Sequence, residues 1–96
     1  MKVRRSAAAS EDIDRIWLHV AQLSPAAADQ LVDRIVAATA PLSDFPDMGS
    51  LRPELGPGIR VVMVGAYLIF YRRRGTELVV ERVLHGRRDI RPGLLG

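Results

Sequence analysis

The sequence predicts an α+β fold in which a two-helix hairpin covers one face of an antiparallel β-sheet. Three observations predict this fold: two helix start signals in the first half, β-rich runs with hairpin-sized turns in the second half, and a length of 96 residues. The expected order is β-α-α-β-β-β, in one domain over residues 1–96. The predicted elements are an opening strand at 2–7, helices at 10–23 and 25–42, and strands at 59–64, 67–73 and 77–85.

The opening strand is short and only Val3 in it is β-branched, so we place it at an edge of the sheet. The first helix follows, with Ser10 as its expected N-cap, because acidic residues fill the next turn. Trp17 lies at the centre of the apolar stripe of this helix, and we expect it to be buried. The stripe consists of Ile13, Ile16, Trp17, Val20 and Ala21.

The second helix begins almost at once, because Ser24 and Pro25 form a cap followed by proline at the first helical position. Pro41 should end or kink it. The two helices should therefore form a hairpin. The apolar stripe of the second helix consists of Ala28, Leu31, Val32, Ile35, Thr39 and Leu42.

Prolines and glycines interrupt residues 43–58 and predict an irregular connector there. We expect its larger apolar side chains, Phe45, Met48, Leu51 and Leu55, to pin the loop to the core. The three strands that follow are joined by short turns, which makes antiparallel neighbours the expectation. The expected core consists of Ile13, Ile16, Trp17, Val20, Leu31, Ile35, Leu42, Ile69, Val80 and Leu84.

Charge is distributed unevenly along the chain, which carries 14 basic and 11 acidic residues in total. Residues 1–48 hold 5 basic and 7 acidic side chains, whereas residues 49–96 hold 9 and 4. The basic second half favours a polyanion or an acidic protein segment as the partner.

Several classes of protein are not expected. The chain has no cysteine, and its histidines, His19 and His85, are far apart, so we expect no disulfide, metal or other cofactor. Acidic residues interrupt the stretch after the basic start, which is not typical of a signal peptide. The longest unbroken apolar run has six residues, at 66–71, against the roughly 20 of a membrane helix. We therefore expect a cytoplasmic protein that does not cross a membrane.

Short motifs occur in a characteristic order over about eighty residues. They are Asp14-x-x-Trp17, Leu42-x-x-Phe45-Pro46-x-Met48-Gly49, Arg52-Pro53-Glu54-Leu55, Gly58-Ile59-Arg60, Tyr67-x-Ile69-x-Tyr71-Arg72 and Arg82-Val83-Leu84-His85-Gly86-Arg87-Arg88-Asp89. In their order and spacing they resemble the RelE/ParE toxin superfamily of bacterial type II toxin–antitoxin systems, and their ending leans toward the ParE branch. The resemblance implies a growth-inhibiting toxin of the kind linked to plasmid stabilization, held in check by a cognate antitoxin.

The resemblance implies one of two targets, DNA gyrase for ParE-like members or ribosome-bound mRNA for RelE-like nucleases. Those nucleases place basic residues at alternate strand positions corresponding to Arg60 and Val62, another near Leu68, and an aromatic or histidine in the tail. Here Val62 and Leu68 are apolar, and the tail has no tyrosine. RNA cleavage requires groups that accept and donate protons and a cation at the phosphate. The sequence therefore favours a nonenzymatic, gyrase-directed toxin over the nuclease.

No catalytic residue is assigned, and each candidate contact also has a structural interpretation. Arg60 and Arg82 could equally pair with Glu77 or Glu81, and His85 more often caps or packs a strand end than acts as a base. Tyr67 and Tyr71 are expected in the core or at its rim. The candidates for target binding are Arg60, Arg82, His85, Arg87 and Arg88.

The expected antitoxin is ParD-like, with a ribbon-helix-helix start and an acidic, disordered C-terminal segment. We expect this segment to bind as an amphipathic helix in a groove along the helix hairpin and the adjoining sheet edge, and to add extended backbone alongside a strand. A nontoxic nucleic-acid-binding module is the remaining alternative, although surface aromatics for base stacking are few. The candidates for antitoxin binding are Arg72, Arg73, Arg74, Trp17, Val20, Leu31 and Ile35.

Overall fold

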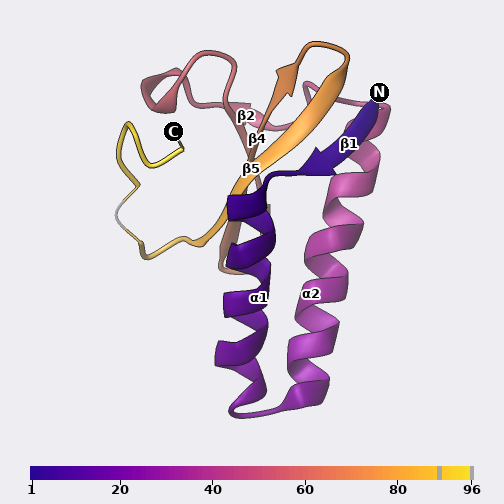
Figure 1. Ribbon diagram of the computed structural model, residues 1–96, viewed down its shortest axis with the longest axis vertical. Coiled ribbons are helices and arrows are strands. Elements are labelled where there is room, and N and C mark those ends of the chain that lie inside the picture. Colours follow the sequence, from indigo (N-terminus) through magenta and orange to yellow (C-terminus); the bar gives the residue numbers. More distant parts are fainter. Residues whose placement is uncertain (89, 96) are drawn as a thin grey trace.

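A computed structural model, which describes residues 1–88 and 90–95, confirms the α+β architecture. Two long helices run side by side against a twisted sheet, and the hairpin extends well beyond the strands (Figure 1). The elements are β1 (Lys2–Arg5), α1 (Ala7–Ala21), α2 (Pro25–Thr39), η1 (Ala40–Ser43), β2 (Ser50–Leu51), η2 (Pro53–Leu55), β3 (Arg60–Val64), β4 (Tyr67–Arg74) and β5 (Glu77–His85).

The sheet has the strand order β1-β5-β4-β3-β2. The meander β3-β4-β5 is antiparallel, as predicted, and β1 lies at an edge. However, β1 pairs parallel with β5, so the sheet is mixed rather than purely antiparallel. The expected connector also supplies a short fifth strand, β2, in which Ser50 pairs with Val61. Local sequence patterns do not specify the direction in which strands distant along the chain will pair.

The predicted N-cap of the first helix was wrong. The helix begins four residues earlier than Ser10 would place it, because the Ser6 hydroxyl accepts a hydrogen bond from the backbone N–H of Ala9 at 3.0 Å. The alanines after Ser6 are strong helix formers and continue directly into the apolar stripe. The second start is confirmed, since the Ser24 hydroxyl caps Ala27 at 3.2 Å.

The core has two parts, one on each face of the sheet. Ile13, Ile16, Ile35 and Ile69 belong to the larger part, between the helices and the sheet. Leu84 is buried, as expected, but it lies on the opposite face. The smaller part consists of Leu55, Ile59, Val61, Phe70, Leu84 and Leu95, with Leu68, Ile90 and Leu94 packed against it. The C-terminal tail therefore covers the sheet face that the helices leave open.

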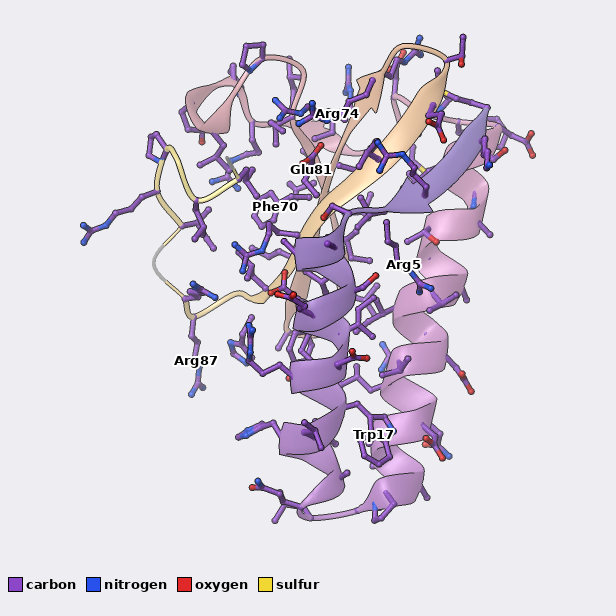
Figure 2. All side chains as sticks on the ribbon, in the orientation of Figure 1. Arg5, Trp17, Phe70, Arg74, Glu81 and Arg87 are labelled. Atoms are coloured by element: carbon purple, nitrogen blue, oxygen red, sulfur yellow. The ribbon has the colours of Figure 1, made fainter. Side chains whose placement is uncertain are left out.

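Trp17 is a correction to the predicted core, because it is only half buried. It lies between α1 and α2 in the part of the hairpin that extends past the sheet (Figure 2). Its indole N–H donates to the Asp29 carboxylate at 2.8 Å. Val20 and Leu31 are half buried in the same way, so periodicity identified the helix–helix seam but not how far the sheet extends beneath it.

Candidate functional site

Three consecutive arginines near the end of β4 have acidic partners within the protein. Arg72 and Arg74 form ion pairs with Glu81, with Nε–Oε1 distances of 3.3 and 2.7 Å. Arg73 pairs with Asp47 at 3.4 Å. The hydrogen bond to Glu81 is the largest cause that raises the pKa of Arg74. These predicted antitoxin contacts therefore lie on a surface whose positive charge is partly compensated.

The Glu81 side chain reaches Arg72 and Arg74 because β5 contains a β-bulge. Phe70 pairs with Arg82, but the next residue, Tyr71, pairs with Val80, so Glu81 is an extra residue. A bulge changes the direction of the side chain it inserts. Figure 2 shows the Glu81 carboxylate close to the labelled arginine of β4.

Arg82 is the centre of a second, internal network. Its Nε and Nη2 atoms donate to the two carboxylate oxygens of Asp12 at 2.7 and 2.9 Å, and its Nη1 donates to the Leu94 carbonyl at 3.2 Å. Asp12, only 3% exposed, also accepts from the Val83 N–H at 3.0 Å. The hydrogen bond to Asp12 is the largest cause that raises the pKa of Arg82. Arg82 thus joins α1, β5 and the tail, whereas the expected partners were acidic residues of its own strand.

Arg60 is also used inside the protein. Its Nη1 donates to the carbonyl oxygens of Gly49 at 2.8 Å and Asp47 at 3.2 Å, rather than to Glu77 or Glu81. Val62 and Val64 follow on the same face of β3 and pack into the core beneath the helices. Of the two β3 positions that the resemblance connects with nuclease chemistry, Val62 is therefore apolar and partly covered, and Arg60 is bound to the connector.

A pocket of about 420 Å³ lies between α1 and the end of β5, and we call it the α1–β5 pocket. It brings together His19 and His85, which are far apart in the sequence. Among the residues described, no cluster of three histidine or acidic side chains is placed to hold a metal ion. The lining residues are Asp12, Arg15, Ile16, His19, Tyr67, Val83, Leu84, His85 and Arg88.

The orientation of His85 is set by two neighbours. Its ring meets the Tyr67 ring edge to face, with centroids 5.2 Å apart, and its Nδ1 accepts from the Arg87 N–H at 3.0 Å. This hydrogen bond assigns the proton of the neutral ring to Nε2. Arg88 lines the pocket, whereas the Arg87 side chain points away from the helices and sheet (Figure 2). Asp89, the last residue of this motif, lies outside the described residues.

The helix residues predicted to bind the antitoxin lie in the seam of the hairpin. Ile35 is fully buried and offers no surface to a partner, while Trp17, Val20 and Leu31 are half buried. A hollow of about 240 Å³ does lie along the hairpin, between α1, α2 and β1, but it is lined by Arg5, Ser10, Ile13, Asp14 and Val32 rather than by the predicted residues.

Three large apolar side chains are exposed together in the connector instead, and we call them the loop patch: Phe45 (66%), Met48 (56%) and Leu51 (51%). The expectation that they would pack into the core was wrong, and only Leu55 of that group is buried. Beside them lies a hollow of about 530 Å³, lined by Pro41, Phe45, Pro46, Asp47, Met48 and Arg73.

A two-helix hairpin on a small mixed sheet is consistent with the α+β fold of ParE-like toxins. The family described as the ParE toxin of the type II toxin–antitoxin system parDE matches residues 3–90. The chain belongs to this family.

Two similar proteins agree with this assignment. The chain is 32% identical over 90 residues to "Toxin ParE3" of Caulobacter vibrioides, an alignment that covers 93% of this chain and 90% of the relative. A solved structure, "Chromosomal ParDE TA system from P. aeruginosa", matches with a TM-score of 0.77 and 27% identity, over 88% of this chain and 95% of that one. The protein is a ParE-type toxin of a type II toxin–antitoxin system, which supports an antitoxin as its partner.

None of the described helices is both long enough and apolar enough to span a bilayer.

Proposed function

We propose that this toxin inhibits growth by acting on DNA gyrase in the cytoplasm without catalysis of its own, and that a ParD-like antitoxin neutralises it. Membership in the ParE family carries this proposal. Gyrase is the target that the family resemblance implies for ParE-like members, and the antitoxin is expected to have a ribbon-helix-helix start and an acidic, disordered end.

The geometry around β3 and His85 disfavours the nuclease alternative. Val62 and Leu68 occupy two of the positions where basic residues would be needed; Val62 packs beneath the helices, and Leu68 packs on the opposite face of the sheet. A base that accepts the proton of a 2′-hydroxyl needs a free ring nitrogen. In the neutral ring of His85, Nδ1 already accepts from Arg87 and Nε2 carries the proton. This arrangement suits hydrogen-bond donation to an anionic group better than proton abstraction.

We place the target contact at the rim of the α1–β5 pocket and at the turn after it. His85 and Arg88 line the pocket, and Arg87 projects from the adjoining turn. Arg82 and Arg60 act differently in this proposal, as positioning residues, because their guanidinium groups hold the tail and the connector.

The two targets are separated by controlled expression of the toxin. Gyrase poisoning should induce the DNA damage response, and the purified toxin should inhibit gyrase supercoiling while translated messages stay intact. Primer extension that reveals codon-phased cuts in ribosome-bound mRNA, with normal supercoiling, would instead establish the nuclease.

The contact surface is tested with charge-neutral variants. Arg87→Gln and Arg88→Gln should relieve growth arrest, because each removes a cation from the proposed contact. Arg5→Gln is the matched control, since Arg5 is an exposed arginine on β1 that lies outside the α1–β5 pocket. If all three variants were as toxic as the wild-type protein, with unchanged melting temperatures, the turn after β5 would be removed from the target interface.

A further inference from the structure

We propose that the loop patch is the docking site for the antitoxin, and that it takes an amphipathic acidic segment of that protein. This inference rests on the proposed function, because it names the surface by which the antitoxin binds. Exposed clusters of large apolar side chains on a small soluble protein mark interaction sites. Phe45, Met48 and Leu51 are exposed within seven consecutive residues; Phe45 and Met48 line one hollow, and Leu51 lines a second hollow that shares Pro46, Asp47 and Arg73 with the first.

The backbone that carries the patch is held from beneath by a buried side chain. Tyr71 is almost fully buried, and its hydroxyl donates to the Pro46 carbonyl at 2.9 Å and accepts from the Gly49 N–H at 2.8 Å. Both anchored residues lie between the exposed members of the patch. The loop is therefore tied to β4 while its largest apolar side chains face outward.

Arg60 supplies a second anchor for the same loop. Its guanidinium donates to the carbonyl oxygens of Asp47 and Gly49, and its Nε lies 3.6 Å from the Asp47 carboxylate. Three backbone groups of the loop, at residues 46, 47 and 49, thus accept from side chains of β3 or β4. A surface held in one conformation before binding loses little conformational entropy when a partner arrives.

The loop packs so closely at Gly49 that no side chain fits at this position. A Cβ atom at this position would lie 2.7 Å from the Tyr71 hydroxyl and 2.8 Å from the Val61 carbonyl oxygen. These distances are too short for non-bonded atoms, so a side chain here would displace the loop from its anchors. The close approach therefore holds the backbone between Met48 and Leu51 against β3 and β4.

Charge around the patch selects the kind of partner. Arg73 lines the apolar hollow, and Arg60 and Arg72 line a smaller hollow that adjoins it and includes Leu51. Asp47 is the single acidic residue of both linings, and it already pairs with Arg60 and Arg73. Glu81 pairs with Arg72 from outside these linings, so three arginines face two acidic residues and the rim keeps a net positive charge. This charge complements an acidic segment whose apolar side chains cover the patch.

We expect the antitoxin to be the protein encoded by the gene adjacent to this one. The test measures the affinity of that purified protein for this toxin and for variants of it. Phe45→Ser and Met48→Ser should each weaken its affinity about tenfold, and the double variant about a hundredfold, because each removes a large apolar contact. Leu23→Ser is the matched control, because Leu23 is 92% exposed but lies at the turn of the helix hairpin, away from the patch. This control should change the affinity less than about twofold. Phe45 and Met48 are exposed, so these variants should melt at the wild-type temperature.

Growth assays then distinguish the possible outcomes. The proposal expects that the double variant stays toxic but is no longer rescued by co-expression of the neighbouring gene. Full rescue and unchanged affinity would overturn the docking site and leave the proposed function intact. If the neighbouring gene product fails to bind even the wild-type toxin, the proposed function itself fails. Loss of toxicity with unchanged antitoxin affinity would assign the patch to the target. A wild-type dimer that the double variant converts to a monomer, again with unchanged antitoxin affinity, would assign it to a second copy of this chain.

Discussion

Two buried polar side chains, Asp12 and Tyr71, join segments that are distant in the sequence. Asp12 connects α1 to the part of β5 that β1 does not cover, since β1 pairs only with residues 77–80. Tyr71 connects β4 to the connector. Each of these side chains forms hydrogen bonds with backbone groups that are shielded from water. Leaving such a buried group without a hydrogen bond would be costly.

Asp12→Asn should lower the free energy of unfolding by about 3 kcal/mol, because it leaves the partly buried Arg82 guanidinium without its counter-charge. Urea denaturation measures this change. Glu54→Gln is the control, since Glu54 also pairs with an arginine, Arg52 at 2.8 Å, but at an exposed site. Its effect should be much smaller than that of Asp12→Asn, because an exposed ion pair contributes little to stability. Equal losses in the two variants would contradict the structural role of Asp12.

Tyr71 predicts a loss of stability in alkaline solution. Burial is the largest cause that raises its pKa, with a smaller contribution from Asp47, although Gly49 and Arg60 oppose the shift. Because the pKa of Tyr71 is raised in the folded state, its stabilisation is complete below the unfolded pKa of about 10. It is lost as the pH rises from that value through the higher pKa of the folded state. Tyr71→Phe removes the titrating hydroxyl and should cost about 1 to 2 kcal/mol at pH 8.

Urea denaturation at pH 8 and at pH 10.5 separates these effects. The difference in stability between wild-type protein and the Tyr71→Phe variant should shrink at the higher pH. A difference that stays constant over this range would show that Tyr71 does not titrate with folding.

At the scale of an element, the start of α1 is defined by tertiary as well as local contacts. The Ser6 hydroxyl accepts from Ala9 in its own helix and donates to the Glu81 carbonyl of β5 at 2.8 Å. The Ser6 N–H also donates to the Val80 carbonyl at 2.9 Å. One residue thus ends β1, begins α1 and extends the edge pairing of β5.

Ser6→Ala should therefore destabilise the protein by about 1 to 2 kcal/mol, the cost of losing an N-cap, whereas Ser10→Ala should change stability little. Thermal denaturation monitored by circular dichroism measures both variants. Ser10 is exposed and lies in the second turn of the helix. A larger loss at Ser10 than at Ser6 would return the helix start to the position that the acidic residues suggested.

At the scale of the whole molecule, the antitoxin is expected to change stability through mass action. A partner that binds only the folded state stabilises it by about 4 kcal/mol when its free concentration is a thousand times Kd. For a chain of 96 residues this corresponds to an increase in melting temperature of roughly 15 °C or more. Differential scanning fluorimetry with and without the neighbouring gene product measures it. Identical melting temperatures at saturating concentration would contradict the partnership.

The candidate site was only partly visible in the sequence. The arginines and His85 were identified, but their partners were not, because Asp12 and Arg82 are seventy residues apart. One local signal did exist. Asp12 lies in the apolar stripe of α1, three residues after Ala9 and four before Ile16, where an acidic residue needs a buried partner.

Local patterns in the sequence determined the helix hairpin, the antiparallel meander and the family, because caps, helical periodicity, turn residues and short motifs act over a few positions. Only the tertiary structure decided that β1 pairs parallel with β5, that Trp17 lies beyond the edge of the sheet (Figure 2), and that His19 and His85 share a pocket. It also decided that the connector exposes its apolar side chains, because a buried tyrosine hydroxyl and an arginine hold its backbone. These features depend on where distant segments of the chain meet, and the spacing of residues along the sequence carries no record of that.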